Sequence, residues 1–145
     1  MRDTTATPDV VPRREEEKLK LKISSQRLAN LIGRYALEKK AADIKVLDLR
    51  KVADITDYFL VCSAEVELQG RAIADHITES LKKKGIKAWH AEGYQNSKWI
   101  LLDYVDVVVH IFLDETREFY GLERLWGDAK VKEIKEKIRV PKKNR

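Results

Sequence analysis

The sequence predicts an α/β sandwich in which helices flank a mixed sheet of five strands. Three observations lead to this fold class: apolar stripes at helical spacing, short continuous apolar runs, and the order in which they alternate along 145 residues. The expected order is one helix, two strands, one helix, three strands and one helix, which favours helices packed on a sheet. A chain of this length suits one compact domain.

The first half of the domain is expected to contain a helix followed by two strands. Ser24 or Ser25 can cap a helix that ends near residue 41 or 42, and its apolar stripe follows helical spacing through Leu28, Leu31, Ile32 and Tyr35. A first strand is expected over 44–49 and a second over 58–62. The second run is apolar at every position, which is typical of a central strand covered on both faces.

The second half is expected to begin with a helix over about 65–84. Lysines at its C-terminal end favour the negative end of the helix dipole, and Gly85 supplies the stop. Three strands are expected next, over 86–92, 99–103 and 107–112, the last two as a hairpin whose turn is flanked by Asp103 and Asp106. A short helix should follow Asp114 and reach Tyr120 or beyond.

The charges divide the chain into three regions. Residues 1–22 are expected to form a disordered charged leader, and the folded domain is expected over 23–129. Residues 130–145 form a basic tail with eight basic and two acidic side chains, and either an amphipathic helix or a solvated tail fits them. Residues 92–128 have eight acidic and three basic side chains. Such a chain suits a partner that offers both basic protein and RNA.

The composition points to the cytoplasm. Cys62 is the only cysteine, so no internal disulfide can form, which fits a reducing compartment. The first 25 residues contain three consecutive glutamates and lack the apolar core of a signal peptide. No run approaches the roughly 18 apolar residues of a membrane span, so no membrane partner is expected.

The side chains that enzymes use are not arranged for catalysis. No Gly-rich phosphate loop occurs, and the single cysteine and three separated histidines do not have the spacing of a zinc site. Cys62 lies in an apolar strand, where a thiol is inert, and His110 fits a hydrogen-bonded strand histidine. No Asp-x-Asp pair is present for two-metal chemistry. We therefore expect no catalytic residue, metal or cofactor.

One ordered set of short motifs resembles a known family. It runs through Asp54–Phe59, Ala72–Ile77 and Glu92-Gly93, and then through Trp99–Tyr104, Asp106–Phe112, Arg117–Tyr120 and Leu122–Ala129. Over about residues 25–129 this set resembles the ribosomal silencing factor family, also called Iojap. The resemblance implies a nucleotidyltransferase-like α/β sandwich without the catalytic residues of nucleotidyltransferases.

The resemblance also implies a function. Members of the family bind a large-subunit ribosomal protein, universal protein fourteen, on the intersubunit face. This binding blocks subunit joining and represses translation when nutrients are scarce, and organelle relatives act in large-subunit assembly. Members often look like homodimers in isolation. Two alternatives of other classes stay open: a nucleotide-binding or nucleotidyltransferase enzyme, and an RNA-binding ribosome assembly factor that acts through the basic tail.

Two groups of residues are candidates for binding. Acidic and aromatic side chains of the 92–128 region could meet a basic ribosomal protein: Asp103, Tyr104, Asp106, Glu118, Tyr120, Glu123 and Trp126. Trp126 fits an interface and a core equally well. Tail lysines could contact ribosomal RNA: Lys130, Lys132, Lys135, Lys142 and Lys143. Other apolar side chains of this region are expected in the core: Trp99, Leu101, Phe112 and Leu125.

Val105 departs from the family pattern, because relatives usually have Gly at this position. If the turn requires a positive φ, a β-branched residue there costs roughly 1–2 kcal/mol. We therefore expect either a different turn or local backbone strain.

Overall fold

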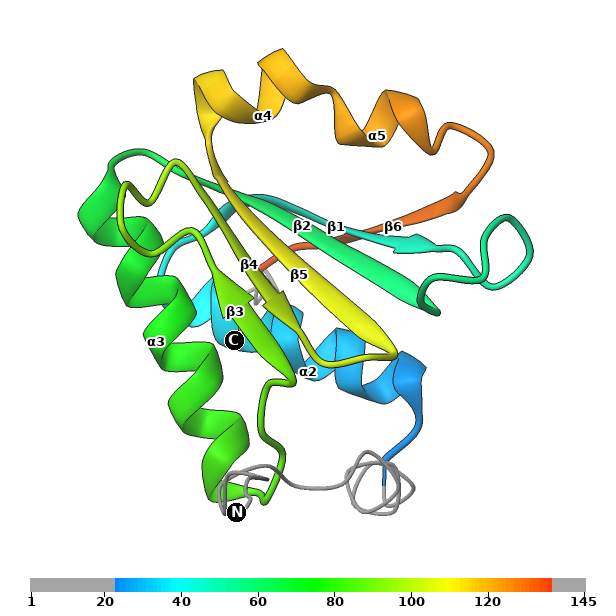
Figure 1. Cartoon of the computed structure of the whole chain (residues 1–145), viewed down its shortest axis with the longest axis horizontal. Helices are drawn as coiled ribbons and strands as arrows, with labels where there is room; N and C mark the ends of the chain where they lie inside the picture. The colour runs from blue at the N-terminus through cyan, green and yellow to red at the C-terminus, as the bar shows by residue number, and fades with distance from the viewer. Residues whose placement is uncertain (1–22, 137–145) are drawn as a thin grey trace, which may run out of the picture.

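The computed structural model describes residues 23–136, which form a sheet with two long helices on one face and two short helices on the other (Figure 1). The helices are α2 (Ser25–Glu38), α3 (Glu67–Lys83), α4 (Asp114–Tyr120) and α5 (Leu122–Leu125). The strands are β1 (Ala42–Asp48), β2 (Tyr58–Ala64), β3 (His90–Glu92), β4 (Trp99–Asp103), β5 (Val107–Leu113) and β6 (Lys130–Ile134). The α/β class predicted from the sequence is confirmed.

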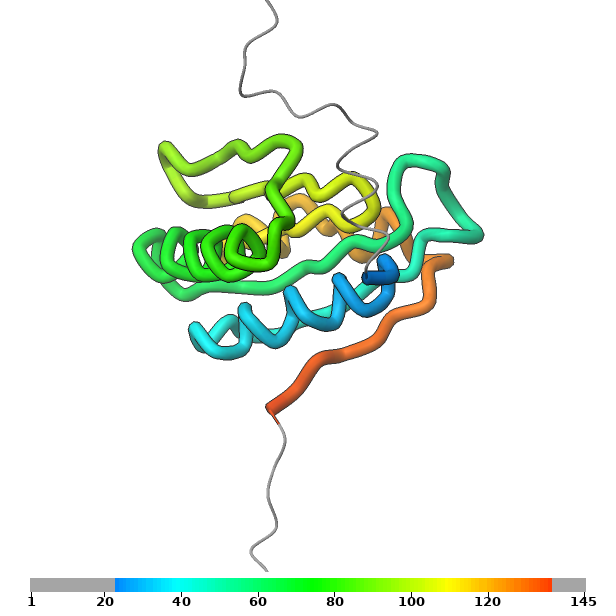
Figure 2. The backbone as a smooth tube through the Cα atoms, turned by 90° about the horizontal axis from the view of Figure 1, so that it is seen from below, coloured from blue at the N-terminus to red at the C-terminus, as the bar shows by residue number. Residues whose placement is uncertain are grey.

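The sheet has six strands in the order β3-β4-β5-β2-β1-β6, so the prediction of five was wrong. Only β2 and β5 run parallel, and every other neighbouring pair is antiparallel. Figure 2 shows β3 and β6 at opposite edges of the sheet. The parallel pair lies at the centre, where covering layers exist on both faces.

Strand β6 is the sixth strand, formed by residues that we expected to be helix or solvated tail. It pairs with β1 in register from Ile44 opposite Ile134 to Asp48 opposite Lys130. Only Ile134 is buried, and it packs against α2 at Gly33, where a Cβ would collide with it. The lysines of β6 lie at the exposed edge, as is common for edge strands. The sheet thus extends past residue 129.

Strand β2 confirms the expectation for a central strand, because all seven of its residues are buried. Side chains of β2 alternate between the two faces and therefore enter two separate cores. Leu60 and Cys62 join the larger core beneath α2 and α3, whereas Phe59 and Val61 join the smaller core beneath α4 and α5.

The two long helices bury large apolar side chains against one face of the sheet. Ser24, one of the two residues expected to cap α2, is the N-cap, and its Oγ accepts a hydrogen bond from the Arg27 N–H at 3.2 Å. Ile32 of α2 and Ile73 and Ile77 of α3 are fully buried against the sheet. The opposite face has only the short helices α4 and α5 above it.

The strand expected over 86–92 is much shorter in the structure. Only His90–Glu92 pairs with β4, and residues 84–89 form the connection from α3. Ile86 is buried, but it fills the space below the end of α3 rather than a strand position. The Trp89 N–H donates to the Asp103 carbonyl at 2.7 Å, which aligns the connection with the end of β4.

Candidate docking surface

Helix α4 has an unusual burial pattern for a helix that lies on a sheet. Its only buried residue is Arg117, whereas Phe119 and Tyr120 expose 79% and 54% of their surface. Gly121 follows at φ 57°, a left-handed conformation that suits glycine, and it ends α4 and begins α5. Leu125 of α5 is 73% exposed. Helix α4 therefore turns a polar side chain inward, and both short helices expose apolar side chains.

The inward side chain, Arg117, fixes the helices to the sheet. Its Nη1 donates to the Ser63 Oγ at the end of β2 and to the Asp43 carbonyl of β1, both at 2.8 Å. Its Nε and Nη2 donate to the two carboxylate oxygens of Glu123 at 2.8 and 3.1 Å. One guanidinium therefore joins α4, α5, β1 and β2.

Glu123 completes this network. Lys45 Nζ lies 3.5 Å from the second carboxylate oxygen of Glu123, so the carboxylate faces two cations. The hydrogen bonds from Arg117 are the largest influence and hold the pKa of Glu123 below its usual value. Glu123 was expected to meet a partner protein, but its charge is already paired within the chain.

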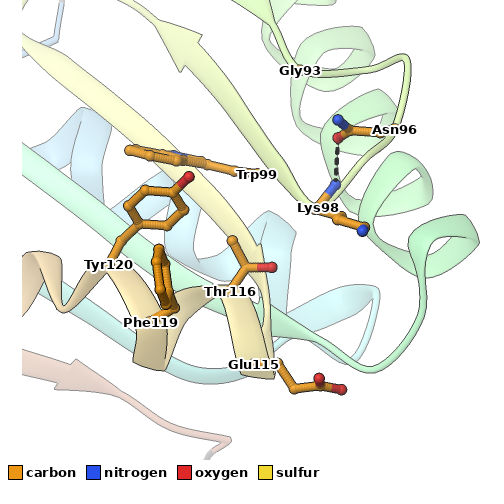
Figure 3. A pocket seen from close by; sticks show the side chains of 8 residues that line it. All are labelled: Gly93, Asn96, Lys98, Trp99, Glu115, Thr116, Phe119 and Tyr120. Atoms are coloured by element: carbon orange, nitrogen blue, oxygen red, sulfur yellow. Dashed lines mark hydrogen bonds between the residues drawn. The ribbon is translucent and has the colours of Figure 1, made fainter.

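Aromatic side chains gather beside α4. The ring of Tyr120 lies 4.8 Å from the indole of Trp99 and 5.0 Å from the ring of Phe119, centroid to centroid. These three rings form one wall of an open cavity of about 580 Å³ (Figure 3). Polar groups complete its lining: Asn96, Lys98, Glu115 and Thr116. The cavity combines aromatic surface with both signs of charge.

A buried histidine supports this wall from below. The Trp99 Nε1–H donates to the Nδ1 of His110 at 3.1 Å, which places the proton of the neutral ring on Nε2. The Nε2 atom is buried and has no hydrogen-bond partner among residues 23–136. Burial lowers the pKa of His110 to about 3. His110 is thus a neutral, hydrogen-bonded strand histidine, as expected from the sequence.

The candidate binding residues do not form one surface. Glu118 and Tyr120 are exposed on α4, and Trp126 is half-buried just after α5, where it packs edge-on against Phe59. Asp103 lies at the opposite end of β4 from Trp99, and so does the turn that follows it. We define the α4–α5 surface as five exposed side chains of the two short helices: Glu115, Glu118, Phe119, Tyr120 and Leu125. Asp114 and Arg124 are also exposed on these helices.

Tyr104 was wrongly expected to be an exposed anchor. It is fully buried in the larger core, and burial raises the pKa of its hydroxyl. The Asp103 Oδ1 accepts a hydrogen bond from the Val105 N–H at 2.7 Å, so this carboxylate stabilises the turn. Asp106 is half-buried in the same turn. This end of the hairpin is therefore chiefly structural.

The turn itself contains the strain expected from Val105. Its φ is 72°, and the Asp106 N–H donates to the Tyr104 carbonyl at 2.9 Å across this single residue. A hydrogen bond over three residues with a positive central φ is a γ-turn of the rare, strained kind. The Thr56 Oγ1 donates to the Val105 carbonyl at 2.9 Å and holds the turn against the β1–β2 connection.

The candidate RNA-contacting lysines differ in where they lie. Lys130 and Lys132 lie exposed on β6, and Lys132 Nζ is 3.3 Å from the Asn30 Oδ1. Lys135 is exposed, with its Nζ 3.4 Å from Glu133. Lys142 and Lys143 lie outside the described residues.

The sequence did not single out Phe119, and it placed Leu125 in the core. Leu125 was misassigned because Leu122 and Leu125 share helical spacing, although only Leu122 packs on the sheet. Nothing in the sequence indicated that Phe119 is exposed, because it lies beside Tyr120 in an ordinary helical segment. The available signal was Arg117, whose neighbours are largely acidic and aromatic.

Other chemistry finds little support in the described part of the chain. Within residues 23–136, no three His, Cys, Asp or Glu side chains come together in a group able to hold a metal ion. Burial raises the pKa of the Cys62 thiol to about 12. Among the helices of residues 23–136, none is long and apolar enough to cross a membrane.

The fold and the α4–α5 surface describe a small α/β domain that presents an acidic and aromatic face. Comparison with known proteins gives the family. Residues 22–145 match the family described as "Ribosomal silencing factor during starvation". The chain belongs to this ribosomal silencing factor family, as the ordered motifs indicated. The family description names a ribosomal silencing role and no catalytic reaction.

Individual relatives agree with this placement. The chain is 38% identical over 112 residues to the ribosomal silencing factor RsfS of Halalkalibacterium halodurans, which covers 77% of this chain and 96% of that protein. It is 39% identical over 97 residues to RsfS of Bacillus subtilis, covering 67% and 82%. A crystal structure of a Chromobacterium violaceum protein superimposes with a TM-score of 0.70 at 30% identity, covering 72% and 88%.

Proposed function

We propose that this protein docks on universal protein fourteen of the large ribosomal subunit through the α4–α5 surface. Bound on the intersubunit face, it would occupy space that the small subunit needs and so repress translation when nutrients are limited. The observation that carries this proposal is the exposure of Phe119, Tyr120 and Leu125 on helices that a buried arginine fixes to the sheet. Steric exclusion requires a specific interface and no catalysed reaction.

The composition of the surface fits a docking role. Hot spots of protein interfaces are rich in aromatic side chains, and three apolar side chains here are more than half exposed within seven positions. The rings contact one another, with Phe119 edge-on to Tyr120 and Tyr120 against Trp99. Because these contacts order the rings before binding, a partner would immobilise few side chains.

The charges of the surface fit a basic partner. Glu115 and Glu118 are exposed on α4 beside the aromatic residues, and Asp114 precedes them. No ion pair joins these three carboxylates to another described residue. Ribosomal proteins are usually basic, so these carboxylates would raise the association rate and favour the correct orientation.

The first experiment is sedimentation of the purified protein with separated ribosomal subunits on a sucrose gradient. Co-migration with the large subunit alone, together with loss of the joined-ribosome peak, is expected. Migration only at the top of the gradient at low salt would contradict docking. Binding to the purified large-subunit protein then tests whether that protein alone is sufficient.

Substitutions test whether the α4–α5 surface is responsible. Phe119→Ser and Leu125→Ser should each weaken binding to the large-subunit protein by roughly 30-fold, which corresponds to about 2 kcal/mol at a hot spot. Leu68→Ser is the matched control, because Leu68 is 70% exposed on α3, which lies on the other face of the sheet from α4 and α5. Equal losses in all three variants would contradict the assignment of the surface.

The basic tail gives a competing explanation that can be tested separately. A chain ending at Glu136 keeps β6, which stabilises the sheet edge, and removes Lys142 and Lys143. If docking depends on the α4–α5 surface, this shortened chain should bind the large-subunit protein as well as the full chain does. A large loss of binding would favour the tail-driven alternative.

Three further features belong to the same proposal. The free protein forms a homodimer, works in the cytoplasm and affects ribosome assembly as well as subunit joining. In this proposal the fold is similar to that of nucleotidyltransferases but serves only as a framework. Sedimentation equilibrium measures the dimer, and a dimer that dissociates when the large-subunit protein is added would mean that both use overlapping surfaces.

A further inference from the structure

The connection between α3 and β3 presents a concentrated positive charge. Lysines occupy four of the six positions from residue 82 to residue 87, and all four are exposed: Lys82, Lys83, Lys84 and Lys87. We call this group, together with Trp89, the α3 lysine segment. No acidic residue occurs between positions 80 and 91. None of the four lysines forms an ion pair with another described residue.

The backbone holds this segment in one conformation. Gly85 has φ 83°, the Gly85 N–H donates to the Lys82 carbonyl, and the Ile86 N–H donates to the Leu81 carbonyl, both at 2.9 Å. These two hydrogen bonds define a Schellman motif, and its usual hydrophobic contact is present because Leu81 and Ile86 are both buried. The chain reversal at Gly85 is therefore fixed by two buried side chains, and the lysines around it are exposed.

Helix capping accounts for only part of this charge. The C-terminal end of a helix has roughly half a negative charge, which one or two lysines of the last turn satisfy. Lys84 lies at the cap and Lys87 beyond the helix, where the dipole has little effect. Four neighbouring positive charges repel one another, so helix stability alone does not explain the cluster.

Trp89 follows Lys87 by two positions in the chain, and its side chain is partly exposed. Trp89 is 44% exposed, and its backbone N–H is held by the Asp103 carbonyl at 2.7 Å. Positive side chains that follow a phosphate backbone, next to an aromatic ring on which a base can stack, are the usual elements of single-stranded nucleic-acid binding.

We propose that the α3 lysine segment binds RNA, and that in the ribosome-bound protein it contacts ribosomal RNA. A membrane surface fits less well, because binding in the lipid interface requires an apolar helix face. The apolar face of α3 is fully buried through Ile73, Ile77 and Leu81. The ribosomal location rests on the proposed function, whereas RNA binding itself does not.

The position of the segment suits a partner made of protein and RNA. Trp99 begins β4 beside the α4–α5 surface, and Asp103 ends β4 beside Trp89. Four residue steps of about 3.3 Å separate these points, so the two surfaces are roughly 13 Å apart along the strand. Figure 1 shows the C-terminal end of α3 at the opposite end of the strands from α4. Both surfaces are thus available at once.

The test measures binding of the full chain to a fluorescein-labelled, mixed-sequence single-stranded RNA across a range of salt concentrations. Replacing Lys82, Lys83, Lys84 and Lys87 by Gln should weaken binding at least tenfold at low salt. Since each neutralised phosphate contributes about 0.7 to the salt slope, the slope should fall by up to about 3. Trp89→Ala should weaken binding roughly fivefold or more while leaving that slope unchanged.

The matched control replaces four lysines elsewhere: Lys132, Lys135, Lys142 and Lys143 by Gln. It removes the same charge, so net charge alone would affect both variants equally. The inference is overturned if the control loses as much affinity as the α3 variant, if the full chain does not bind RNA, or if anionic vesicles are bound instead. Unchanged thermal unfolding must accompany each variant. Loss of RNA binding with intact binding to the large-subunit protein would leave the proposed function standing.

Discussion

The buried imidazole of His110 makes the stability of this protein depend on pH in the mildly acidic range. In the unfolded chain the ring takes up a proton near pH 6.5, whereas in the folded protein burial lowers its pKa to about 3. Between these values the unfolded state binds one more proton than the folded state. Stability is therefore lost as the pH falls below about 6.5 and this loss levels off below about 3.

The size of the effect follows from the separation of these values. One pKa unit corresponds to about 1.4 kcal/mol, so at pH 5 the unfolded state gains about 2 kcal/mol from protonation of this ring. The result needs only a folded pKa well below 5. Protonation at Nδ1 would also break the hydrogen bond from Trp99, whose indole contacts Tyr120.

Urea unfolding at pH 7 and pH 5, followed by circular dichroism, measures this loss of stability. His110→Gln keeps a side chain that can accept from the Trp99 indole and cannot take up a proton in this range. Its loss of stability between the two pH values should be smaller than that of the unsubstituted chain by about 2 kcal/mol. His90→Gln removes an exposed imidazole instead and serves as the matched control. Equal losses in the unsubstituted chain and His110→Gln would refute the reasoning.

Three further predictions concern the framework of the site. Val105→Gly should be more stable than Val105→Ala by about 1 kcal/mol in urea unfolding, since φ is 72° there; a preference for Ala would exclude backbone strain. Arg117→Ala should lower the free energy of unfolding by about 3 kcal/mol, because it leaves buried partners unpaired, and Glu123→Gln should lower it clearly less. The stability due to Glu123 is present above its unfolded pKa and is lost as the pH falls through its lower folded pKa. Cys62 should react with a thiol reagent at pH 8 only after unfolding, as its buried thiol has a pKa of about 12; rapid reaction of the folded protein would contradict this.

The sequence predicted the elements whose burial is complete. Strand β2 was identified because all its positions are apolar, and α2 because a serine cap precedes a regular apolar stripe. The stop of α3 at Gly85 was also correct, since positive φ favours glycine. In each case one local signal and the tertiary packing required the same residue types.

The sequence failed where a short element is stabilised by partners distant in the chain. Residues 130–134 contain three polar side chains and two apolar ones at helical spacing, yet pairing with β1 makes them a strand. Nothing in the sequence of these residues indicates that the edge of β1 is available for pairing. The exposed face of α4 was equally hidden, because seven residues give less than two helical turns and no reliable stripe.

The arrangement around Arg117 is itself an argument for a docking role. An apolar contact, with apolar partners in place of the present acceptors, would hold the helices without the cost of burying a charge. Instead the chain buries a guanidinium that donates four hydrogen bonds to acceptors on three elements, and exposes Phe119, Tyr120 and Leu125 to water. A buried charge is costly to desolvate, and the exposed apolar side chains do not stabilise the free protein. Both are reasonable if the orientation of α4 and α5, with its aromatic side chains outward, is required by a partner that covers them.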